Sequence, residues 1–309
     1  MNYISEKIAL YKKGHLEKKA FTELMFNEHH SVLFDFAHHL KQTNIKSIEI
    51  TDDEVVVTTR DRGLRLFAPN FDHRSTVTEI LNFFDYEKFE YRMLDLLIND
   101  GDVIFDIGAN IGYYSLNLAL SRRKSLVFAF EPIPETFGLL RRNVSMNAVF
   151  NIKINNFALS DMSGENVLYY YAEHSGNASL SNLTGRSDVQ EILCKSHTLD
   201  SFVAINECRL DFMKVDVEGA ELKVLTGGLE TIKRFRPIIF AEILRKWSSK
   251  FGYDPNEIFD LLRSLGYCSF VVDRFCLRQF DRMDEDTMET NFFFLHSSDH
   301  SRLIERFSL

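Results

Sequence analysis

Apolar residues recur at roughly helical spacing through the first 43 residues of the chain, with few helix breakers between them. This pattern predicts that the chain begins with helices. Between residues 46 and 70 the pattern changes to short runs rich in β-branched and aromatic residues, separated by polar turns. We predict a small β-meander there, with strands at 47–50, 55–59 and 64–67, followed by a helix at 86–99.

From residue 103 to the end of the chain, buried-strand patterns alternate with helix patterns. The predicted strands cover residues 103–107, 126–130, 152–157, 210–215, 237–242, 269–273 and 291–296. The predicted helices cover residues 113–120, 133–147, 218–226 and 255–265. Such alternation is typical of βαβ units, so the predicted fold class is α/β, with a doubly wound, mostly parallel seven-stranded sheet. No helix separates the last two strands, which predicts an antiparallel hairpin at one edge of the sheet.

The change of pattern divides the chain into two predicted parts. Residues 1–85 form an N-terminal extension, helical at first and then a small β-meander, and residues 86–309 form the α/β domain. A polar stretch at 161–200 interrupts the alternation of strands and helices. It is long enough for us to expect a functional loop or lid there.

Composition and charge narrow the classes of function. The 309 residues include 36 Lys and Arg against 45 Asp and Glu, a formal net charge of −9, which disfavours a dedicated nucleic-acid-binding protein. There is no signal-peptide pattern at the start and no uncharged apolar run of about 20 residues, so we predict no transmembrane segment. The four cysteines form no Cys-x-x-Cys pair. We therefore expect a cytoplasmic protein with reduced thiols.

Glycine is scarce, at 14 of 309 residues, and one glycine cluster follows the strand predicted at 103–107. It reads Asp106-Ile-Gly108-Ala-Asn110-Ile-Gly112 and leads into a predicted helix. Ligands of open α/β sheets bind outside the carboxyl ends of the strands, and the two glycines allow a tight turn and close approach of a ligand. A dinucleotide site needs the spacing G-x-G-x-x-G, whereas this loop has G-x-N-x-G behind an acid. The acid suits a ligand with a positive charge, such as an ammonium or sulfonium group.

Glu131 follows the next predicted strand, in the sequence Phe-Glu-Pro. An acid at this position can accept hydrogen bonds from both ribose hydroxyls, as in nucleotide-binding α/β folds. The alternative is that Glu131 only caps the helix predicted at 133. Together with the 106–112 loop, it describes a pocket for an adenosyl group joined to a cationic amino acid, and we therefore predict S-adenosylmethionine as the cofactor.

The chain also resembles the FkbM-family methyltransferases, which belong to the class I, Rossmann-like group that uses S-adenosylmethionine. The resemblance covers roughly residues 86–245 and rests on DIGANIGYYSL (106–116), FEP (130–132), ALSD (158–161) and KVDVEGAE (214–221). It implies that Asp106, Gly108, Asn110 and Gly112 surround the methionine part of the cofactor and that Glu131 holds the ribose. It also implies that Ala158, Ser160 and Asp161 lie near the adenine.

A third motif, residues 214–219, follows the strand predicted at 210–215, where a substrate would meet the methyl group. A hydroxyl acceptor must lose its proton, and a carboxylate is a suitable base. We therefore expect Asp216 and Glu218 to be catalytic, with Lys214 pairing with one of them or binding the cofactor. Alternatively, Asp216 is a helix N-cap and Glu218 a first-turn acid. Asp216 and Glu242 could also bind a divalent cation, although two carboxylates without a third ligand argue against a metal site.

These features predict an S-adenosylmethionine-dependent O-methyltransferase that acts on a hydroxyl group of a sugar, glycan or secondary metabolite. A non-catalytic methyltransferase-like scaffold is the main alternative, with residues 1–85 as its interaction module. An NAD-dependent oxidoreductase is a second alternative, which the loop spacing disfavours. The expected partner is a small-molecule or glycan acceptor and not a nucleic acid, and the N-terminal helical region is a candidate surface for homo-oligomer formation.

Overall fold

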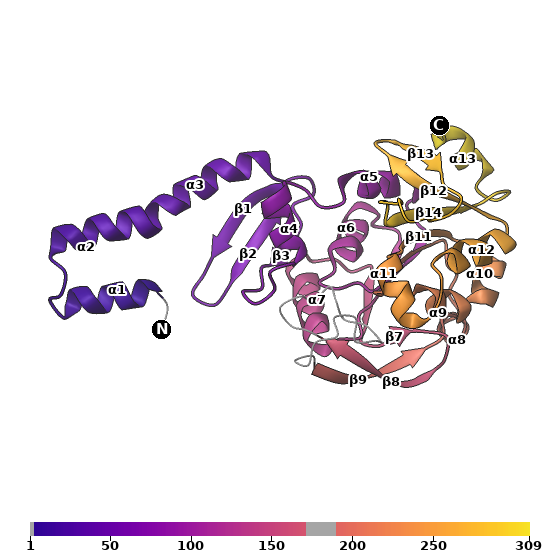
Figure 1. The fold of residues 1–309 in the computed structure, drawn as a ribbon, viewed down its shortest axis with the longest axis horizontal. Coiled ribbons are helices and arrows are strands. Elements are labelled where there is room, and N and C mark those ends of the chain that lie inside the picture. The colour runs from indigo at the N-terminus through magenta and orange to yellow at the C-terminus, as the bar shows by residue number, and fades with distance from the viewer. Residues whose placement is uncertain (1–2, 171–189) are drawn as a thin grey trace.

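The computed structural model describes residues 3–170 and 190–309, and its centre is an eight-stranded sheet (Figure 1). The order of the strands is β13-β12-β14-β11-β10-β4-β5-β6. Their bounds are β4 (Val103–Ile107), β5 (Leu126–Phe130), β6 (Ile152–Asn155), β10 (Phe212–Val215), β11 (Ile238–Glu242), β12 (Tyr267–Asp273), β13 (Cys276–Gln279) and β14 (Asn291–His296). Strands β6, β5, β4, β10 and β11 are parallel, and β14 runs antiparallel to both of its neighbours. The predicted α/β class and the mostly parallel sheet are confirmed.

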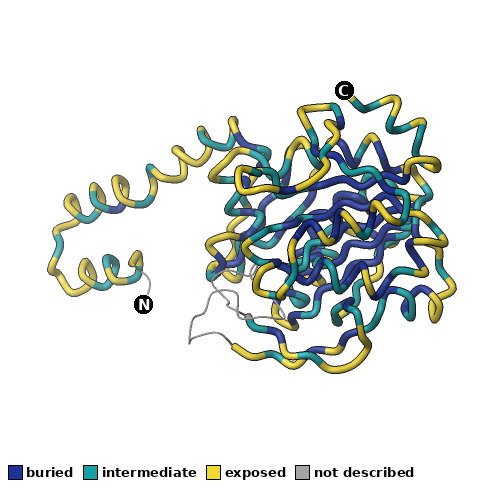
Figure 2. Tube along the Cα trace, turned by 45° about the vertical axis from the view of Figure 1, so that its right-hand side comes forward, coloured by how far each residue is buried: buried dark blue, intermediate teal, exposed yellow. Residues whose placement is uncertain are grey.

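Successive residues of the central strands point into two different hydrophobic cores. Ile104 belongs to one core and Phe105 to the other, and Phe212 and Met213 alternate in the same way. Helices α5 (Lys88–Leu97) and α6 (Tyr113–Ser121) contribute to the first core, and α8 (Leu199–Asn206), α9 (Glu221–Thr226), α10 (Leu229–Phe235) and α12 (Asn256–Ser264) to the second. Because both faces of the strands are covered, their sequences are almost continuously apolar. Figure 2 shows the strands buried at the centre of the molecule.

The edge of the sheet differs from the prediction in one respect. The predicted antiparallel pair, β12 and β14, is present, but β14 lies between β11 and β12 inside the sheet. The edge is instead a hairpin of β12 with β13, an eighth strand that was not predicted. Only one of the four residues of β13, Leu277, is fully buried. Its sequence therefore lacks the apolar pattern that identified the other strands.

Helix boundaries agree with the predictions except at α9. We expected this helix to start at residue 218, whereas it starts at Glu221. Glu218 and Gly219 have φ values of +52° and +97°, in the left-handed region, so neither can be part of a right-handed helix. Several short helices were not predicted: α4 (Thr76–Phe83), α8, α10, α11 (Arg245–Ser248) and α13 (Ser301–Phe307). Helix α7 (Pro134–Met146) lies within its predicted range.

The N-terminal extension starts with a helical arm that projects from the rest of the molecule (Figure 1). The arm comprises α1 (Tyr3–Lys12), α2 (Lys18–Met25), a π-helical turn (Phe26–His30) and α3 (Ser31–His39), as the sequence predicted. The predicted meander follows, as β1 (Ile45–Ile50), β2 (Val55–Thr59) and β3 (Arg65–Phe67). Ile45, Val57 and Leu66 of the meander share a hydrophobic core with the central sheet. The division at residue 85 stays a prediction.

The interruption at 161–200 contains ordered strands at both ends. Strands β7 (Ala158–Leu159), β8 (Gly164–Tyr170) and β9 (Gln190–His197) form a small sheet in the order β7-β9-β8. The rest of the predicted loop or lid, residues 171–189, lies outside the described residues. Among the helices that the structure describes, none is long and apolar enough to cross a membrane.

Candidate functional site

The glycine loop joins β4 to α6 at the carboxyl end of the sheet. Gly108 has a φ of +82°, and a Cβ atom there would lie 1.7 Å from the backbone oxygen of Asp216. Gly112 has a φ of +90°, and a Cβ atom there would lie 2.5 Å from Leu140 Cδ1. Asn110 also adopts a left-handed conformation, with a φ of +49°, which asparagine tolerates better than most residues. The loop is therefore tight because glycine and asparagine occupy the positions that demand them.

Glu131 ties this loop to the strand beside it. Its Oε2 accepts a hydrogen bond from the backbone nitrogen of Asn110 at 3.0 Å, and its Oε1 accepts one from that of Ile133 at 2.9 Å. Burial raises the pKa of Glu131 to about 7. The bond to Ile133, the N-cap residue of α7, bears out the capping interpretation. The bond to Asn110 brings the carboxylate beside the glycine loop, as the cofactor interpretation requires.

Asp106 lies beneath the loop and is 1% exposed. Its Oδ2 accepts hydrogen bonds from the backbone nitrogen of Ser115 at 3.0 Å and from Ser115 Oγ at 2.5 Å. Its Oδ1 is buried without a hydrogen bond and lies 3.9 Å from Lys214 Nζ. Burial raises the pKa of Asp106. Asp106 thus fixes the start of α6, and its role toward the methionine part of a cofactor stays a prediction.

Lys214 lies between two carboxylates at the carboxyl end of β10. Strand pairing puts it directly beside Asp106, and its Nζ donates a hydrogen bond to Asp216 Oδ2 at 2.8 Å. Burial alone would lower the pKa of Lys214, but the carboxylates of Asp216 and Asp106 outweigh burial and raise it. The lysine is therefore a permanent cation. Asp216 is more accessible than Lys214 and Asp106, because 26% of its side chain is exposed against 6% and 1% of theirs.

Glu242, at the end of β11, is within hydrogen-bonding reach of Asp216, and burial together with the Asp216 carboxylate raises its pKa well above the ordinary range. Burial and a neighbouring carboxylate both favour the protonated form of Glu242. Among the described residues, no group of three or more His, Cys, Asp or Glu side chains is arranged to hold a metal ion.

Glu218 lies in the loop between β10 and α9. Burial, followed by the charge of Asp216, raises the pKa of Glu218 to about 9. The helix-capping alternative for this motif is wrong: α9 begins at Glu221, its N-cap residue is Ala220, and neither Asp216 nor Glu218 is part of the helix end.

Glu221 is the residue that fixes this loop. Its Oε1 accepts hydrogen bonds from the backbone nitrogens of Gly219 at 2.9 Å and Val217 at 3.3 Å. Tyr253 donates its hydroxyl to Glu221 Oε2 at 3.2 Å. Burial raises the pKa of Glu221 to about 7. Glu221 stands in the quoted motif 214–221, so the sequence contained this residue but gave no sign of its role.

Glu87 was not predicted from the sequence. It precedes α5 in a left-handed conformation, accepts a hydrogen bond from the Tyr114 hydroxyl and accepts another from Asn291 Nδ2 at 3.1 Å. Burial raises its pKa, and Lys214 and Asp216 are near enough to influence it. A residue of the segment before the glycine loop therefore supplies a further carboxylate to the site.

The residues predicted near the adenine are divided between two places. Ala158 packs against the hydrophobic cluster that contains Ile133, and Ile133 follows Glu131 and Pro132 in the chain. Ser160 donates its hydroxyl to Asp161 at 2.9 Å, and its backbone oxygen leaves no room for a side chain at Gly227. Asp161 lies 3.9 Å from Lys223 Nζ on α9. Only Ala158 is thus in contact with the Glu131 region, and the adenine contacts stay a prediction.

The donor set fits S-adenosylmethionine in charge and in hydrogen-bond acceptors. Five carboxyls surround Lys214 and interact with it or with one another: Glu87, Asp106, Asp216, Glu218 and Glu242. Those of the five that are ionised favour a sulfonium and an ammonium group, whereas Glu218, with a pKa of about 9, is protonated at neutral pH. The Glu131 carboxylate has lone pairs beyond those used by its two amides, which the two ribose hydroxyls could occupy. The missing side chain at Gly108 lets the loop pack directly against the backbone of Asp216.

Comparison with known proteins gives one family. The model of the methyltransferase FkbM domain matches residues 106–268, which is just over half of the chain. Methyltransferase 1 of Beauveria bassiana is 28% identical over 146 residues, covering 41% of this chain and 59% of that protein. Hexuronic acid methyltransferase AglP of Haloferax volcanii is 30% identical over 177 residues, covering 56% and 67%. The 31-O-demethyl-FK506 methyltransferase FkbM of Streptomyces tacrolimicus is 28% identical over 158 residues, covering 42% and 60%. The chain spans about three fifths of the length of the first of these relatives.

Proposed function

The chain belongs to the FkbM methyltransferase family, and from this membership we propose that it transfers a methyl group from S-adenosylmethionine to a hydroxyl group of a sugar, glycan or secondary metabolite. The names of two relatives support the acceptor class, since one acts on a hexuronic acid and the other on a demethylated FK506. The observation that carries the proposal is the bond from the Asn110 amide to Glu131, because it holds the proposed ribose acceptor directly beside the glycine loop.

We infer the following roles in cofactor binding. Glu131 accepts the ribose hydroxyls, and Gly108 and Gly112 let the loop pack against the Asp216 backbone and Leu140, which sets the turn that borders the ligand. Asp106 and Asn110 border the methionine part. Ala158 borders the adenine, and Ser160 and Asp161 follow it in the chain toward α9. The bound cofactor supplies a methyl group on a positively charged sulfur, and the electron pair of the broken carbon–sulfur bond stays on sulfur when the acceptor oxygen takes the methyl.

Asp216 is our candidate for the base that removes the proton of the acceptor hydroxyl. It is the accessible carboxylate at the mouth of the site, and the ion pair with Lys214 holds it in one orientation. Lys214 itself cannot serve as a base, because its neighbouring carboxylates raise its pKa and keep it protonated. Glu218, with a pKa of about 9, is protonated at neutral pH and is better suited to donating a hydrogen bond. Alignment of the acceptor oxygen with the methyl group supplies the rest of the rate enhancement.

Transfer of a labelled methyl group tests this function. Purified protein is incubated with S-adenosylmethionine labelled in the methyl group and with a panel of sugars, glycans and small hydroxyl compounds. We expect a base-stable product, because a methyl ether resists the alkali that hydrolyses a methyl ester. Asp216→Asn is the test variant, and Asp286→Asn, which changes an exposed aspartate outside the carboxyl cluster, is the matched control. Turnover that survives Asp216→Asn unchanged would contradict the role of this residue, and cofactor binding without any turnover would favour the scaffold alternative.

We also propose that the helical arm mediates homo-oligomer formation. Phe26, Leu33 and Phe34 are more than half exposed on the arm, and α1 and α3 bury no residue. Exposed apolar surface of this kind is typical of protein interfaces. Light scattering of the full chain and of a chain without residues 1–43 tests this, and equal subunit numbers in the two would contradict it.

The four cysteines are unpaired, as is usual in a reducing compartment, and the proposed location is the cytoplasm.

A further inference from the structure

A cavity of about 510 Å³ lies between the meander of the N-terminal extension and the starts of α5 and α6. The meander contributes Arg60 and Arg62 to its lining, and the helix starts contribute Tyr86, Arg92 and Tyr113. Its volume is within the range of small-molecule sites. Neither the resemblance nor the family match, which starts at residue 106, accounts for most of this lining.

The cavity adjoins the methyl-transfer site. Tyr86 lines the cavity and directly precedes Glu87, which is part of the carboxyl cluster. Tyr113 also lines the cavity, and its neighbour Tyr114 donates its hydroxyl to Glu87. The rings of Tyr86 and Tyr113 meet edge to face, with centroids 5.3 Å apart. A ligand in the cavity would therefore lie against aromatic rings that border the cluster containing Asp216.

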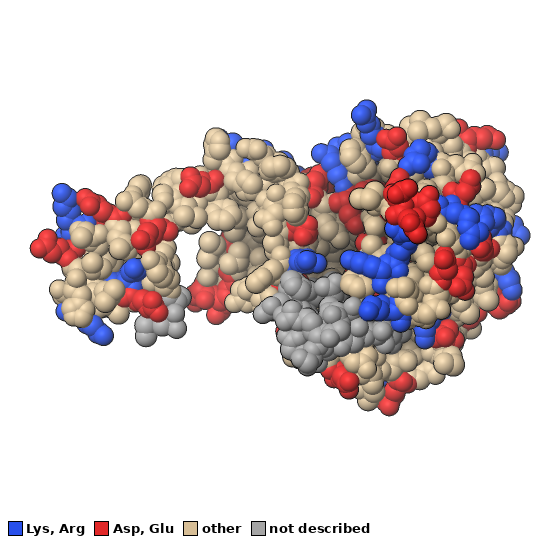
Figure 3. Space-filling model, viewed as in Figure 1, with Lys and Arg blue, Asp and Glu red and all other residues tan. Residues whose placement is uncertain are grey.

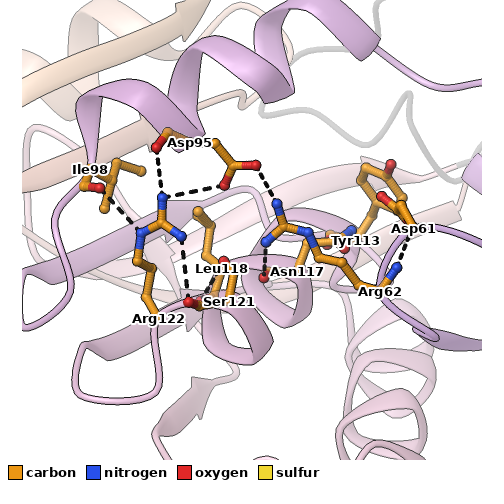
Figure 4. A network of polar contacts seen from close by, with 9 residues as sticks. All are labelled: Asp61, Arg62, Asp95, Ile98, Tyr113, Asn117, Leu118, Ser121 and Arg122. Carbon is orange, nitrogen blue, oxygen red and sulfur yellow. Dashed lines mark hydrogen bonds and ion pairs between the residues drawn. The ribbon is translucent and has the colours of Figure 1, made fainter.

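An ion-pair network holds the meander against α5 and α6 on the side of the cavity that Arg62 and Asp95 line (Figure 4). Arg62 reaches from the meander to an ion pair with Asp95 on α5, and it donates to the backbone oxygen of Asn117 on α6 at 3.4 Å. Arg122 donates to the backbone oxygens of Asp95 at 2.7 Å and Ile98 at 3.2 Å. The Asp95 carboxylate is thus shared by two guanidinium groups. The meander is fixed against the helices, so the cavity is preformed.

The charges that line the cavity do not balance. Four cations and three carboxylates contribute to it. Arg62 is paired with Asp95, and Lys88 lies 3.6 Å from Asp85. Within residues 3–170 and 190–309, Arg60 and Arg92 form no ion pair; Arg60 bonds to backbone oxygens, and Arg92 lies over the ring of Phe275. Acidic and basic side chains are interspersed over the face seen in Figure 3. Four cations against three carboxylates leave one net positive charge, and Arg92, which lies over a ring and not beside a carboxylate, is its most available carrier.

We propose that this cavity is the acceptor subsite and that it binds a sugar carrying an anionic group, a carboxylate or a phosphate. The sugar ring lies against Tyr86 and Tyr113, and the anionic group binds Arg92. Arg60 already donates Nε and Nη2 to the backbone oxygens of Thr43, Leu40 and Ile45, so it contributes only Nη1. Guanidinium groups suit this role because they bind carboxylate and phosphate with two parallel hydrogen bonds. The inference rests on the proposed function, since it supplies the hydroxyl that the methyl group reaches. The N-terminal extension is then part of the acceptor site and sets its specificity.

Ligand-observed NMR with saturation transfer tests the proposal on the full chain with S-adenosylhomocysteine bound. The probes are D-glucuronate, D-glucose 6-phosphate and neutral D-glucose at equal millimolar concentrations. We expect saturation of at least one anionic sugar and weaker or no saturation of glucose, and the comparison of the two anionic probes distinguishes carboxylate from phosphate. Arg92→Ala is expected to weaken binding of that probe roughly tenfold or more, with partial recovery in Arg92→Lys.

Arg234→Ala is the matched control. Arg234 lines a second cavity of about 480 Å³ and lies over the ring of Phe235, much as Arg92 lies over Phe275. This variant is expected to bind the probes as the wild type does. Equal binding of glucose and the anionic sugars, unchanged binding in Arg92→Ala, or no binding of either anionic probe would each overturn the proposal. Binding of S-adenosylhomocysteine is measured separately, so its failure would overturn the proposed function and not only the acceptor subsite.

Discussion

Replacing Gly108 by alanine should abolish cofactor binding while leaving most of the fold intact. The new Cβ would lie 1.7 Å from the backbone oxygen of Asp216, whereas real Cβ atoms stay beyond 3.0 Å. The oxygen cannot yield, because the end of β10 is paired with β4 and the Asp216 nitrogen bonds to Ile107 at 3.0 Å. The loop must move instead. Left-handed strain of about 1–2 kcal/mol and overpacking of about 1–3 kcal/mol predict a loss of about 2–5 kcal/mol in unfolding free energy.

Alanine variants of two other glycines separate the backbone strain from the overpacking in this loss of stability. Gly63 has a φ of +66° but nothing within 4 Å of an added Cβ, so Gly63→Ala should cost only the strain of about 1–2 kcal/mol. Gly138, in the middle of α7, has open space and no positive φ, and Gly138→Ala should stabilise the helix by about 0.5–1 kcal/mol. Urea denaturation measures all three, and calorimetry with S-adenosylhomocysteine measures binding. If Gly108→Ala binds with wild-type affinity, the assignment of this loop to the cofactor is wrong.

Three further predictions concern the chemistry of the site. Asp216→Asn should lower kcat by about 10²–10⁴-fold, as expected for loss of a general base, and should change the Kd of S-adenosylhomocysteine little. A kcat within twofold of wild type would contradict the role of Asp216 as the base. Glu131, Glu221 and Glu218 have pKa values raised by burial to about 7, 7 and 9 from 4.5. The folded chain therefore holds more protons than the unfolded chain between these pKa values. The free energy of unfolding without cofactor should fall as pH rises from about 4.5 to about 9. Thermal melts that show stability rising over this window would refute the raised pKa values. Activity should survive excess EDTA, because the described residues contain no cluster of three metal ligands; inactivation that Mg²⁺ reverses would revive the pairing of Asp216 with Glu242.

The glycine loop and Glu131 could be predicted from the sequence because each carries a local signal. Both stand directly after an apolar strand, and parallel strands bring their carboxyl ends to the same edge of the sheet. The bond between Asn110 and Glu131 joins residues 21 positions apart across neighbouring strands. Strand order was not needed to pair them, since consecutive strands of a βαβ unit usually lie side by side.

Glu87 could not be predicted because its place in the site depends on tertiary contacts alone. It reaches the carboxyl cluster through Tyr114 and through Asn291, which is 204 positions away. The start of α9 was missed for a different reason. The predicted helix 218–226 ran through Gly219, and nothing in the sequence indicated that Glu218 and Gly219 would be left-handed and that Glu221 would bond back to the loop.

The most direct test of the central claim is a calorimetric titration of S-adenosylhomocysteine into the wild type and into Glu131→Gln. A glutamine at this position can accept a bond from only one of the Asn110 and Ile133 amides, and it loses the charge that would bind the ribose hydroxyls. Glu135→Gln, an exposed residue on the first turn of α7, is the control. We predict one site per chain in the wild type and in Glu135→Gln, and affinity lowered about tenfold or more in Glu131→Gln. No binding heat in the wild type, or equal affinity in all three proteins, would contradict the account.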